Sequence, residues 1–337
     1  MKAAICRTWG PPSVLTVEEV ASPALLPTTV RIKVRAAEVG FQDVLMIAGK
    51  YQSKPDFPFI PGNEISGKVL ECGSQATAYK PGDRVLALVM HGGYAEQVVA
   101  PEAAVVKLPP EVDFVSAAVL GMAYGTAFNG LVDRAQLAPG ETLLVRGAGS
   151  GVGLAAVDLA RELGATIVAA ASSNEKLSAA AKAGAHHVVN TSVEDLRTRV
   201  LEITAGKGAD VIFDPIGADF KQSCLRCIAR KGRILIVGFA GGEIPAIPAN
   251  YLILKYCSIL GVNWGPFYGA SEPQRFREVL GELLRMCASG KIHPGIGHTY
   301  PLERVSDALT LLASRKAVGR IALICDWGAG QDRFSRR

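Results

Sequence analysis

The chain has 337 residues, of which 49% are hydrophobic and 20% charged, a balance typical of a folded globular protein that excludes an intrinsically disordered one. The formal net charge is +5 and the basic residues are scattered apart from residues 333–337, so we expect no nucleic-acid partner. No apolar run is long enough to span a membrane and the first residues lack the apolar core of a secretory signal, so we expect a cytoplasmic protein without membrane contact. A chain of this length predicts two domains.

The first 123 residues predict a β-rich domain, because short apolar runs alternate with Pro and Gly. Residues 30–36 alternate apolar and charged side chains as a half-buried strand does, and residues 65–73 and 80–87 continue this pattern. The arrangement is typical of a small β-barrel rather than of a doubly wound sheet.

A glycine-rich loop at residues 147–153 follows a predicted strand, 142–145, and precedes a predicted helix, 154–160. A second apolar run at residues 166–171 completes the strand-helix-strand unit that a dinucleotide-binding loop requires. The glycine spacing is a variant of the common fingerprint, so the loop alone does not separate a cofactor site from a structural turn. The surrounding unit favours the cofactor site.

Glycines in this loop let the backbone approach a pyrophosphate. The phosphate oxygens then meet the free N–H groups and the positive dipole at the start of the helix. We therefore predict dinucleotide contacts at four residues of the loop, namely Gly149, Ser150, Gly151 and Val152.

From about residue 118 the sequence alternates strands and helices, and the later strands are predicted at residues 187–189, 211–214, 233–237 and 258–262. With the first two strands they make six, which is enough for a complete Rossmann sheet. A final strand at residues 320–325 finds no partner in that sheet and is therefore assigned to the first domain.

A long helix is predicted beyond residue 271, with Ser271 and Gln274 as a capping box and an end at Gly290. Its apolar stripe consists of Phe276, Val279, Leu280, Leu283 and Leu284. The predicted domains are then a discontinuous first domain, residues 1–123 and 266–337, and a dinucleotide-binding domain, residues 124–265.

The residues after the second Rossmann strand bear on which dinucleotide binds. NAD-binding sheets carry an acidic residue there that accepts hydrogen bonds from the ribose and repels a 2′-phosphate. Here Ser172 and Ser173 take that place and Lys176 follows. These groups can bind and neutralise a phosphate, which favours NADPH. Glu175 is unfavourable to this interpretation, and Lys176 could instead lie on an exposed helix face.

The seven cysteines are odd in number and mostly isolated, which is typical of reduced thiols. Cys224 and Cys227 have the spacing of a zinc or redox pair, but no second pair lies near them in the sequence. We therefore expect both to serve as core or helix-surface residues.

Further motifs run through the whole chain: Met1-Lys2-Ala3-Ala4, Phe41-Gln42-Asp43, Gly49-Lys50-Tyr51, Pro58-Phe59-Ile60-Pro61-Gly62, Gly82-Asp83-Arg84-Val85, Gly92-Gly93-Tyr94-Ala95-Glu96 and Gly232-Arg233. With them the chain resembles the medium-chain dehydrogenase/reductase superfamily, and specifically its zinc-free quinone oxidoreductase branch, to which zeta-crystallin belongs. The resemblance implies an α/β fold in which a GroES-like β-barrel catalytic domain is joined to a Rossmann doubly wound parallel sheet. It also implies a homodimer joined at the sheet edges near residues 258–265.

Zinc-dependent members of this superfamily carry a Cys or His after an early strand and then a Gly-His-Glu motif. Here the first position falls within Gly40-Phe41-Gln42 and the second reads Gly62-Asn63-Glu64, so we expect no metal. Without a Lewis acid, hydride transfer suits quinones and enones, because their product oxyanions are much weaker bases than an alkoxide.

The resemblance implies two catalytic residues. Tyr51 matches the tyrosine that related enoyl thioester reductases use as a donor to the substrate, and its alternative is a surface tyrosine beside a proline turn. Asp43 could orient the nicotinamide end of the cofactor or cap the next helix. The branch usually has Asn before Phe41, and Gly40 in its place enlarges the pocket and removes a donor.

The resemblance also implies cofactor contacts at Thr126, Phe239, Asn263 and Arg315. Thr126 lies near the nicotinamide in relatives, and Arg315 reaches the NADPH, although a solvated charge at a helix end is the alternative. Thr191 stands where several relatives have a tyrosine near the adenosine phosphate, so we include it as a cofactor contact.

The leading hypothesis is an NADPH-dependent, zinc-independent reductase that transfers hydride to a quinone, with the conjugated substrate and the nicotinamide meeting between the domains. The alternative enzyme is an enoyl thioester or alkenal reductase, in which Tyr51 would matter more. The alternative of another class is a non-catalytic NADPH-binding protein, since a fold does not fix a function.

Overall fold

A computed structural model of the protein describes residues 1–325, apart from the side chain of Phe267. These residues divide into two compact units. Unit 1 contains Met1–Val119, His298–Ala317 and the chain from Ile321 onward, and unit 2 contains Leu120–Gly297 and Val318–Arg320. The first unit is discontinuous, but the chain returns to it at residue 298 and not at the predicted residue 266.

The later return has a packing cause. α8 (Pro266–Ser271) and α9 (Pro273–Ala288) follow the last Rossmann strand, and α9 packs on α3 (Gly121–Phe128) of unit 2. The predicted apolar stripe of α9 is fully buried there, and the Phe276 ring stacks on Trp264 with 5.0 Å between centroids. The helix therefore belongs to unit 2 because its apolar face has its partner in that unit.

The predicted capping box at the start of α9 is wrong. The cap position is Glu272, which makes no side-chain cap hydrogen bond. The Ser271 hydroxyl donates to the Tyr268 carbonyl at 3.0 Å, because Ser271 is the last residue of α8. Pro273 begins the helix, a position where its missing N–H costs no hydrogen bond.

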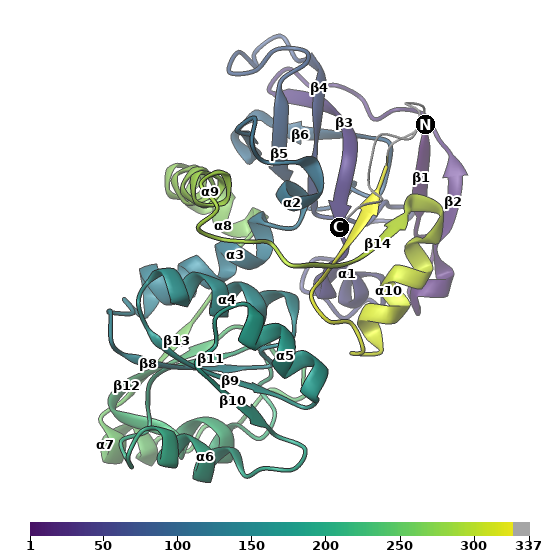
Figure 1. The fold of residues 1–337 in the computed structure, drawn as a ribbon. Helices are drawn as coiled ribbons and strands as arrows, with labels where there is room; N and C mark the ends of the chain where they lie inside the picture. The colour runs from purple at the N-terminus through teal and green to yellow at the C-terminus, as the bar shows by residue number, and fades with distance from the viewer. Residues whose placement is uncertain (326–337) are drawn as a thin grey trace. The chain divides into compact units, whose positions relative to one another are not determined.

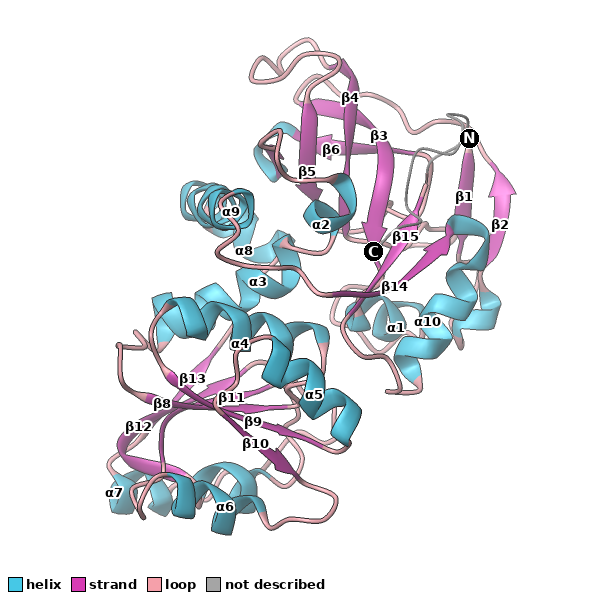
Figure 2. Ribbon diagram, viewed as in Figure 1, coloured by secondary structure: helices cyan, strands magenta, loops and turns pink. Residues whose placement is uncertain are grey.

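Unit 1 is built on a sheet that has seven strands within residues 1–325, in the order β14-β15-β3-β4-β5-β7 with β6 paired to β3 (Figures 1 and 2). The strands are β3 (Thr29–Glu38), β4 (Glu64–Cys72), β5 (Arg84–Leu88), β6 (Gln97–Pro101), β7 (Val105–Lys107), β14 (Ile296–Pro301) and β15 (Arg320–Ile324). β1 (Lys2–Ile5) and β2 (Thr16–Glu19) form a separate antiparallel pair. The helices of this unit are α1 (Phe41–Ile47), α2 (Phe114–Ala118) and α10 (Val305–Ala313).

β3 shows how the sequence specifies this sheet. Val30, Ile32 and Val34 are fully buried, while Lys33 between them is exposed, as alternation along a half-buried strand requires. The strand predicted at residues 80–87 begins only at Arg84, because a turn precedes it in which the Asp83 N–H donates to the Lys80 carbonyl. The C-terminal strand β15 lies in the sheet of unit 1, as predicted, and its partner there is β3.

Unit 2 contains a six-stranded parallel sheet in the order β10-β9-β8-β11-β12-β13. The strands are β8 (Thr142–Arg146), β9 (Thr166–Ala171), β10 (His187–Asn190), β11 (Ala209–Asp214), β12 (Ile228–Ile236) and β13 (Ser258–Gly261), and all six were predicted. α4 (Gly151–Glu162) and α5 (Asn174–Lys182) cover one face, and α6 (Leu196–Ile203) and α7 (Asn250–Lys255) cover the other (Figure 1). This is a doubly wound Rossmann sheet, whose strand order reverses between β8 and β11.

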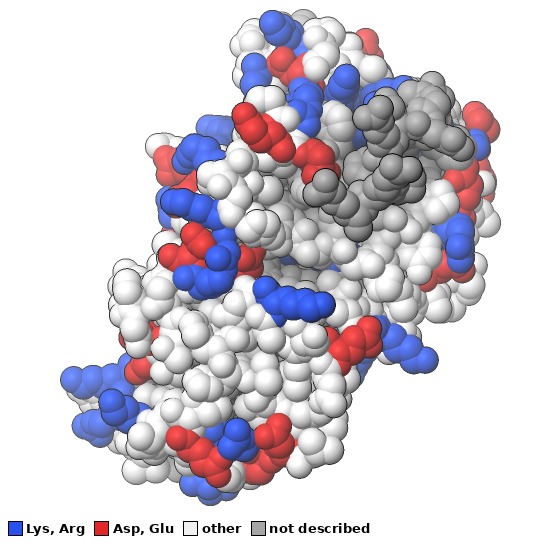
Figure 3. All heavy atoms as spheres, viewed as in Figure 1, with Lys and Arg blue, Asp and Glu red and all other residues white. Residues whose placement is uncertain are grey.

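The cysteines follow the sequence prediction. All seven are free thiols, and Cys224 and Cys227 are buried in the apolar core of unit 2. Charged side chains of both signs are interspersed on the face drawn in Figure 3. Within residues 1–325, no helix combines the length and the apolar character needed to cross a lipid bilayer.

Candidate active site

The glycine loop of unit 2 has the geometry of an anion-binding loop. Gly147 has a φ of +60°, which turns the chain sharply at the end of β8. The Ser150 hydroxyl caps α4 by accepting from the Gly153 N–H at 3.1 Å, and it donates to the Gly147 carbonyl at 2.7 Å. A Cβ on Gly153 would lie 2.4 Å from that carbonyl oxygen. Only glycine at position 153 lets the helix begin this close to the strand.

The structure brings two predicted cofactor residues together. A Cβ on Gly149 would lie 2.4 Å from the Lys176 Cβ, so the start of α5 packs directly on the loop. Ser173 caps α5, since its hydroxyl accepts from the Lys176 N–H at 3.4 Å, and Ser172 beside it is exposed. The Cβ and Cγ of the half-buried Lys176 side chain therefore pack against the loop.

The predicted contact Thr191 lies directly after β10, and its N–H donates to the Ala171 carbonyl at 3.0 Å. The next residue, Ser192, donates from its hydroxyl to the Ser172 carbonyl at 2.8 Å. The ends of β9 and β10 are thus tied together beside Ser172 and Ser173. Thr191 itself is exposed at this edge.

Thr126, Phe239 and Asn263 are spread over unit 2. Thr126 lies on α3 and donates to the Met122 carbonyl at 2.6 Å. Phe239 follows β12, is 40% exposed, and packs on Gly217, where a Cβ would lie 2.7 Å from its ring. Asn263 is exposed beyond β13, next to Trp264. Each stands on α3 or after the carboxyl end of a strand, the position where cofactor contacts are expected.

A buried arginine that the sequence did not single out supports the glycine loop. The Arg320 side chain is 3% exposed and donates to the Gly151 carbonyl at 3.3 Å. Its guanidinium also lies 5.3 Å above the Tyr124 ring, a cation–π contact. Tyr124 in turn donates to Asp158 at 2.7 Å. In the sequence, the one feature that could have pointed to Arg320 is its place as a basic residue at the start of an otherwise apolar strand.

The two residues predicted to be catalytic, Asp43 and Tyr51, lie in unit 1, where Asp43 is fully buried. Its Oδ2 accepts from the Tyr94 hydroxyl at 2.8 Å and from the Gly40 N–H at 3.1 Å, and its Oδ1 accepts from the Gly62 N–H at 3.0 Å. Burial raises the pKa of Asp43 to about 7, against the lowering effect of these hydrogen bonds. The contact with Gly40 is the one expected of the helix-capping alternative, since Gly40 is the cap residue of α1, whereas Tyr94 and Gly62 belong to other segments.

Tyr51 is half-buried at the end of the turn that leaves α1. Its N–H donates to the Leu45 carbonyl, and its hydroxyl donates to Gln42 Oε1 at 3.5 Å. Burial raises the pKa of Tyr51, and the negative charge of Asp43 raises it further. Tyr51 therefore keeps its proton at neutral pH and is available as a hydrogen-bond donor. Gln42 is a neighbour that the sequence did not identify as functional.

The positions of the absent zinc ligands are occupied by tightly held residues. Asn63 is 2% exposed, and its side-chain oxygen has no hydrogen-bond partner in the described part of the chain. A Cβ on Gly40 would lie 3.2 Å from the Asp43 carboxylate, so the larger pocket expected at Gly40 is limited by Asp43. Within residues 1–325, no cluster of three or more His, Cys, Asp or Glu side chains could hold a metal ion.

Arg315 lies in unit 1, just beyond the end of α10. It is exposed and adopts a φ of +60°. This placement at a helix end agrees with both alternatives that the sequence left open, a cofactor contact and a solvated charge.

Comparison with known proteins finds a matching family domain in each of the two units. Residues 26–110 match the alcohol dehydrogenase GroES-like domain, and residues 151–285 match the zinc-binding dehydrogenase domain. A quinone oxidoreductase-like protein 2 homolog from Nematostella vectensis is 41% identical over 96% of this chain and 88% of its own length. The quinone oxidoreductase-like protein 2 from Bos taurus is 39% identical over 96% of this chain and 92% of its own.

Solved structures of oxidoreductases are similar to this chain over nearly its whole length. The Escherichia coli quinone oxidoreductase complexed with NADPH is 28% identical, with a TM-score of 0.89 and coverage of 96% of this chain and 100% of its own. An NAD-dependent alcohol dehydrogenase is 31% identical, with a TM-score of 0.86 and coverage of 96% and 99%.

The two matched domains and the Rossmann glycine loop define an oxidoreductase with a GroES-like domain and a doubly wound sheet. More particularly, the chain belongs to the zinc-free quinone oxidoreductase branch of the medium-chain dehydrogenase/reductase superfamily.

Proposed function

We propose that this chain is an NADPH-dependent, zinc-independent oxidoreductase that transfers hydride to a quinone. The observation that carries the proposal is the Tyr51 hydroxyl, which keeps its proton at neutral pH and stands beside Gln42 in the unit whose zinc-ligand positions hold Gly40 and Asn63. A neutral donor of this kind suits an oxyanion that needs hydrogen bonds and no Lewis acid. Relatives named quinone oxidoreductase-like protein 2 and a solved quinone oxidoreductase from Escherichia coli support the choice of acceptor.

The cofactor preference is argued from the start of α5. The exposed Ser172 hydroxyl, the Ser173 cap and the Lys176 side chain follow the tip of β9, and Ser172 stands where NAD-binding sheets carry an acidic residue. Glu175 in the first turn of α5 is the one group unfavourable to this preference. A phosphate at this point would gain hydrogen bonds and a counter-charge. The Escherichia coli relative complexed with NADPH supports this preference, whereas the NAD-dependent relative is a reason to measure it.

The residues of this chain would act by binding and proton supply. When bound, the dihydronicotinamide supplies a hydride, which reduces the quinone by two electrons. The Tyr51 hydroxyl donates to the oxygen on which negative charge develops, and that oxygen takes its proton from Tyr51 or from water. Asp43 is a positioning residue, since it fixes Gly40 and Gly62 through their N–H groups.

A reductase acting on enoyl thioesters or alkenals is the second candidate. The same hydroxyl favours it, because a tyrosine that is protonated at neutral pH can protonate the enolate carbon that hydride addition to the double bond leaves. In that enzyme the tyrosine proton would be transferred in every turnover, so removal of the hydroxyl would be far more damaging.

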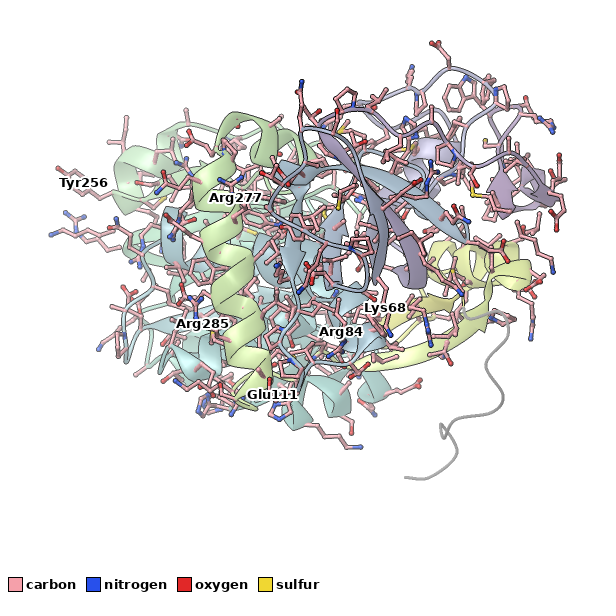
Figure 4. All side chains as sticks on the ribbon, turned by 90° about the horizontal axis from the view of Figure 1, so that it is seen from above. Lys68, Arg84, Glu111, Tyr256, Arg277 and Arg285 are labelled. Carbon is pink, nitrogen blue, oxygen red and sulfur yellow. The ribbon has the colours of Figure 1, made fainter. Side chains whose placement is uncertain are left out.

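We further propose a homodimer that joins copies at β13. This strand is the edge of the sheet and pairs with β12 on one side. α7, which packs on the neighbouring strand β12, exposes Ile253 (79%) and Leu254 (68%), and Tyr256 directly after it points away from unit 2 (Figure 4). An unpaired edge next to exposed apolar side chains is typical of a surface that a second copy covers.

The test is steady-state oxidation of NADPH and NADH with a panel of quinones and enones, with and without a chelator. We expect turnover with quinones that a chelator does not reduce. No oxidation with any acceptor would leave the non-catalytic NADPH-binding protein as the better hypothesis. Loss of activity on chelation would contradict zinc independence.

A further inference from the structure

Four side chains that the proposed function does not use form an aromatic surface on unit 1. Trp9 follows β1, Phe57 and Phe59 flank Pro58, and His91 follows β5. The centroid of Trp9 lies 4.4 Å from Phe57 and 5.8 Å from Phe59, and Phe57 stacks on Phe59 at 5.7 Å. His91 meets the edge of Phe59 at 6.4 Å. We call these four residues the aromatic platform.

The platform has a buried base and an exposed top. Phe59 is only 4% exposed and belongs to the core of unit 1, whereas Trp9 is 37% and Phe57 40% exposed. Met90, directly before His91, is 36% exposed. Large apolar side chains that gather at the surface, rather than scatter singly, mark a place where apolar surface is covered by a ligand or partner.

The backbone holds the platform in place before anything binds. The N–H of Gly10, next to Trp9, donates to the Ile47 carbonyl at 2.9 Å. Phe59 and Cys6 exchange both of their backbone hydrogen bonds, at 2.8 and 3.1 Å. A rigid aromatic surface loses little conformational entropy on binding, which favours a binding role.

The platform is continuous with the proposed catalytic residues. A Cβ on Gly49 would lie 3.1 Å from the Trp9 ring, and Gly49 stands two residues before Tyr51 in the turn that leaves α1. At its other end, Phe59 leads through Pro61 to Gly62, whose N–H donates to Asp43. An acceptor placed at Tyr51 would therefore have the platform beside it.

The charges near the platform indicate which ligand it fits. None of its side chains carries a carboxylate, ammonium or guanidinium group, and the exposed neighbours Lys50, Lys54 and Asp56 carry charges of both signs. A surface for an anionic lipid or an acidic peptide would need charges of one sign. Aromatic faces without such charges fit a flat or apolar, uncharged group.

We propose that the aromatic platform binds the apolar substituent of the electron acceptor, so that the preferred acceptor is a quinone that carries an alkyl or prenyl chain. This inference rests on the proposed quinone reductase function. It adds a specificity subsite, formed by Trp9 and Phe57, to the residues that act on the quinone ring.

The experiment compares unsubstituted para-benzoquinone with its decyl-substituted analogue as acceptors for the full-length protein. We expect the wild type to have a KM at least about tenfold lower for the decyl quinone. Trp9→Ala and Phe57→Ala should each raise the decyl-quinone KM by about five- to tenfold, with kcat and the KM for benzoquinone nearly unchanged. Leu70→Ala is the matched control, because Leu70 is 40% exposed on β4 of the same unit.

Equal KM values for the two quinones in the wild type, or equal effects of the variants on both, would overturn the subsite while leaving the quinone reductase standing. Trp9→Phe should retain most of the preference, which keeps the test valid if Trp9→Ala does not fold. If the wild type reduces neither quinone, the proposed function fails. The platform is then tested by the affinity of the decyl quinone for the wild type and for Trp9→Phe/Phe57→Leu, and equal affinities would overturn it. A variant that changes the oligomeric state without changing the KM would show that a second copy covers this surface, which would also overturn the subsite.

Discussion

The guanidinium of Arg146 lies 2.8 Å from the carboxylate of Asp214, and both side chains are buried. Arg146 is the last residue of β8, directly before the glycine loop, and Asp214 is the last residue of β11. Arg146 also donates to the Ala218 carbonyl at 2.8 Å, while Asp214 accepts from the Gly217 N–H at 3.2 Å. The ion pair therefore ties together the two strand ends at which the sheet order reverses, where dinucleotides bind.

Replacing one partner of this pair should be strongly destabilising. Arg146→Met leaves a buried carboxylate without its counter-charge, and we expect a loss of about 3 to 5 kcal/mol in the free energy of unfolding of unit 2. Denaturant unfolding combined with hydrogen exchange at β8 and β11 measures it. Arg146→Met with Asp214→Asn should lose less than the sum of the single changes, and strict additivity would show that the two side chains are not coupled. Arg304→Met, in an exposed pair with Asp307, should leave stability nearly unchanged.

The glycine loop should not accept a methyl group at position 153. Because a Cβ there would lie 2.4 Å from the Gly147 carbonyl, we expect Gly153→Ala to cost about 1 to 3 kcal/mol of stability and to weaken NADPH binding. Thermal unfolding and cofactor titration by fluorescence measure the two effects. Gly295→Ala is the control, since nothing lies within 4 Å of its Cβ position. If Gly153→Ala binds NADPH with unchanged affinity, this loop does not contact the cofactor.

Lys176 should discriminate between the two nicotinamide cofactors. Lys176→Ala removes a positive charge at the tip of β9, so we expect the KM for NADPH to rise about tenfold while the KM for NADH changes little. Steady-state kinetics with both cofactors at low and moderate salt provide the measurement, and the effect should shrink as salt rises. Lys182→Ala, at the other end of α5, should change neither KM. A parallel rise for both cofactors would argue against a 2′-phosphate at Lys176.

Asp43 should make stability depend on pH in a defined direction. Its pKa is raised to about 7 by burial, so between its ordinary value and 7 the folded protein holds a proton that the unfolded chain releases. Stability from this group therefore increases as pH falls from 8 to 5, by an amount on the order of 2 to 3 kcal/mol. The stability difference between wild type and Asp43→Asn, measured across this pH range, isolates the effect. If the stability of the wild type relative to Asp43→Asn does not change with pH, or increases towards high pH, the raised pKa of Asp43 is contradicted.

Tyr51→Phe should separate the two candidate enzymes. The substitution removes the hydroxyl that donates to Gln42 and keeps the ring. If a quinone is the acceptor, we expect kcat to fall by less than about fivefold, because water can supply the proton to a weakly basic oxyanion. With a crotonyl thioester as substrate we expect a fall of about a hundredfold or more. The opposite order of sensitivity would favour the enoyl thioester reductase.

Several site features had no local pattern that could reveal them. The strand predicted at residues 80–87 begins at Arg84 because a turn at residues 80–83 precedes it, and the cap expected at Ser271 is absent because that residue ends α8. Lys176 was proposed from its position after β9, but its packing on Gly149 is a product of the folded unit. For Asp43 the sequence allows a cofactor role or a helix cap; its contact with Gly40 agrees with the cap, and the contacts with Gly62 and Tyr94 come from distant segments that no local pattern reveals.

The sequence by itself determined the six Rossmann strands, the glycine loop, the return of the last strand to the first unit and the absence of the family's zinc ligands. These features depend on side-chain period and short motifs, which local backbone geometry converts directly into structure. Only the tertiary structure decided the Arg146–Asp214 pair, 68 residues apart, the Arg320 contact with Gly151, 169 residues apart, and the aromatic platform. Each of these joins segments that the sheet topology makes neighbours, and a local pattern carries no record of which distant segment will supply the partner.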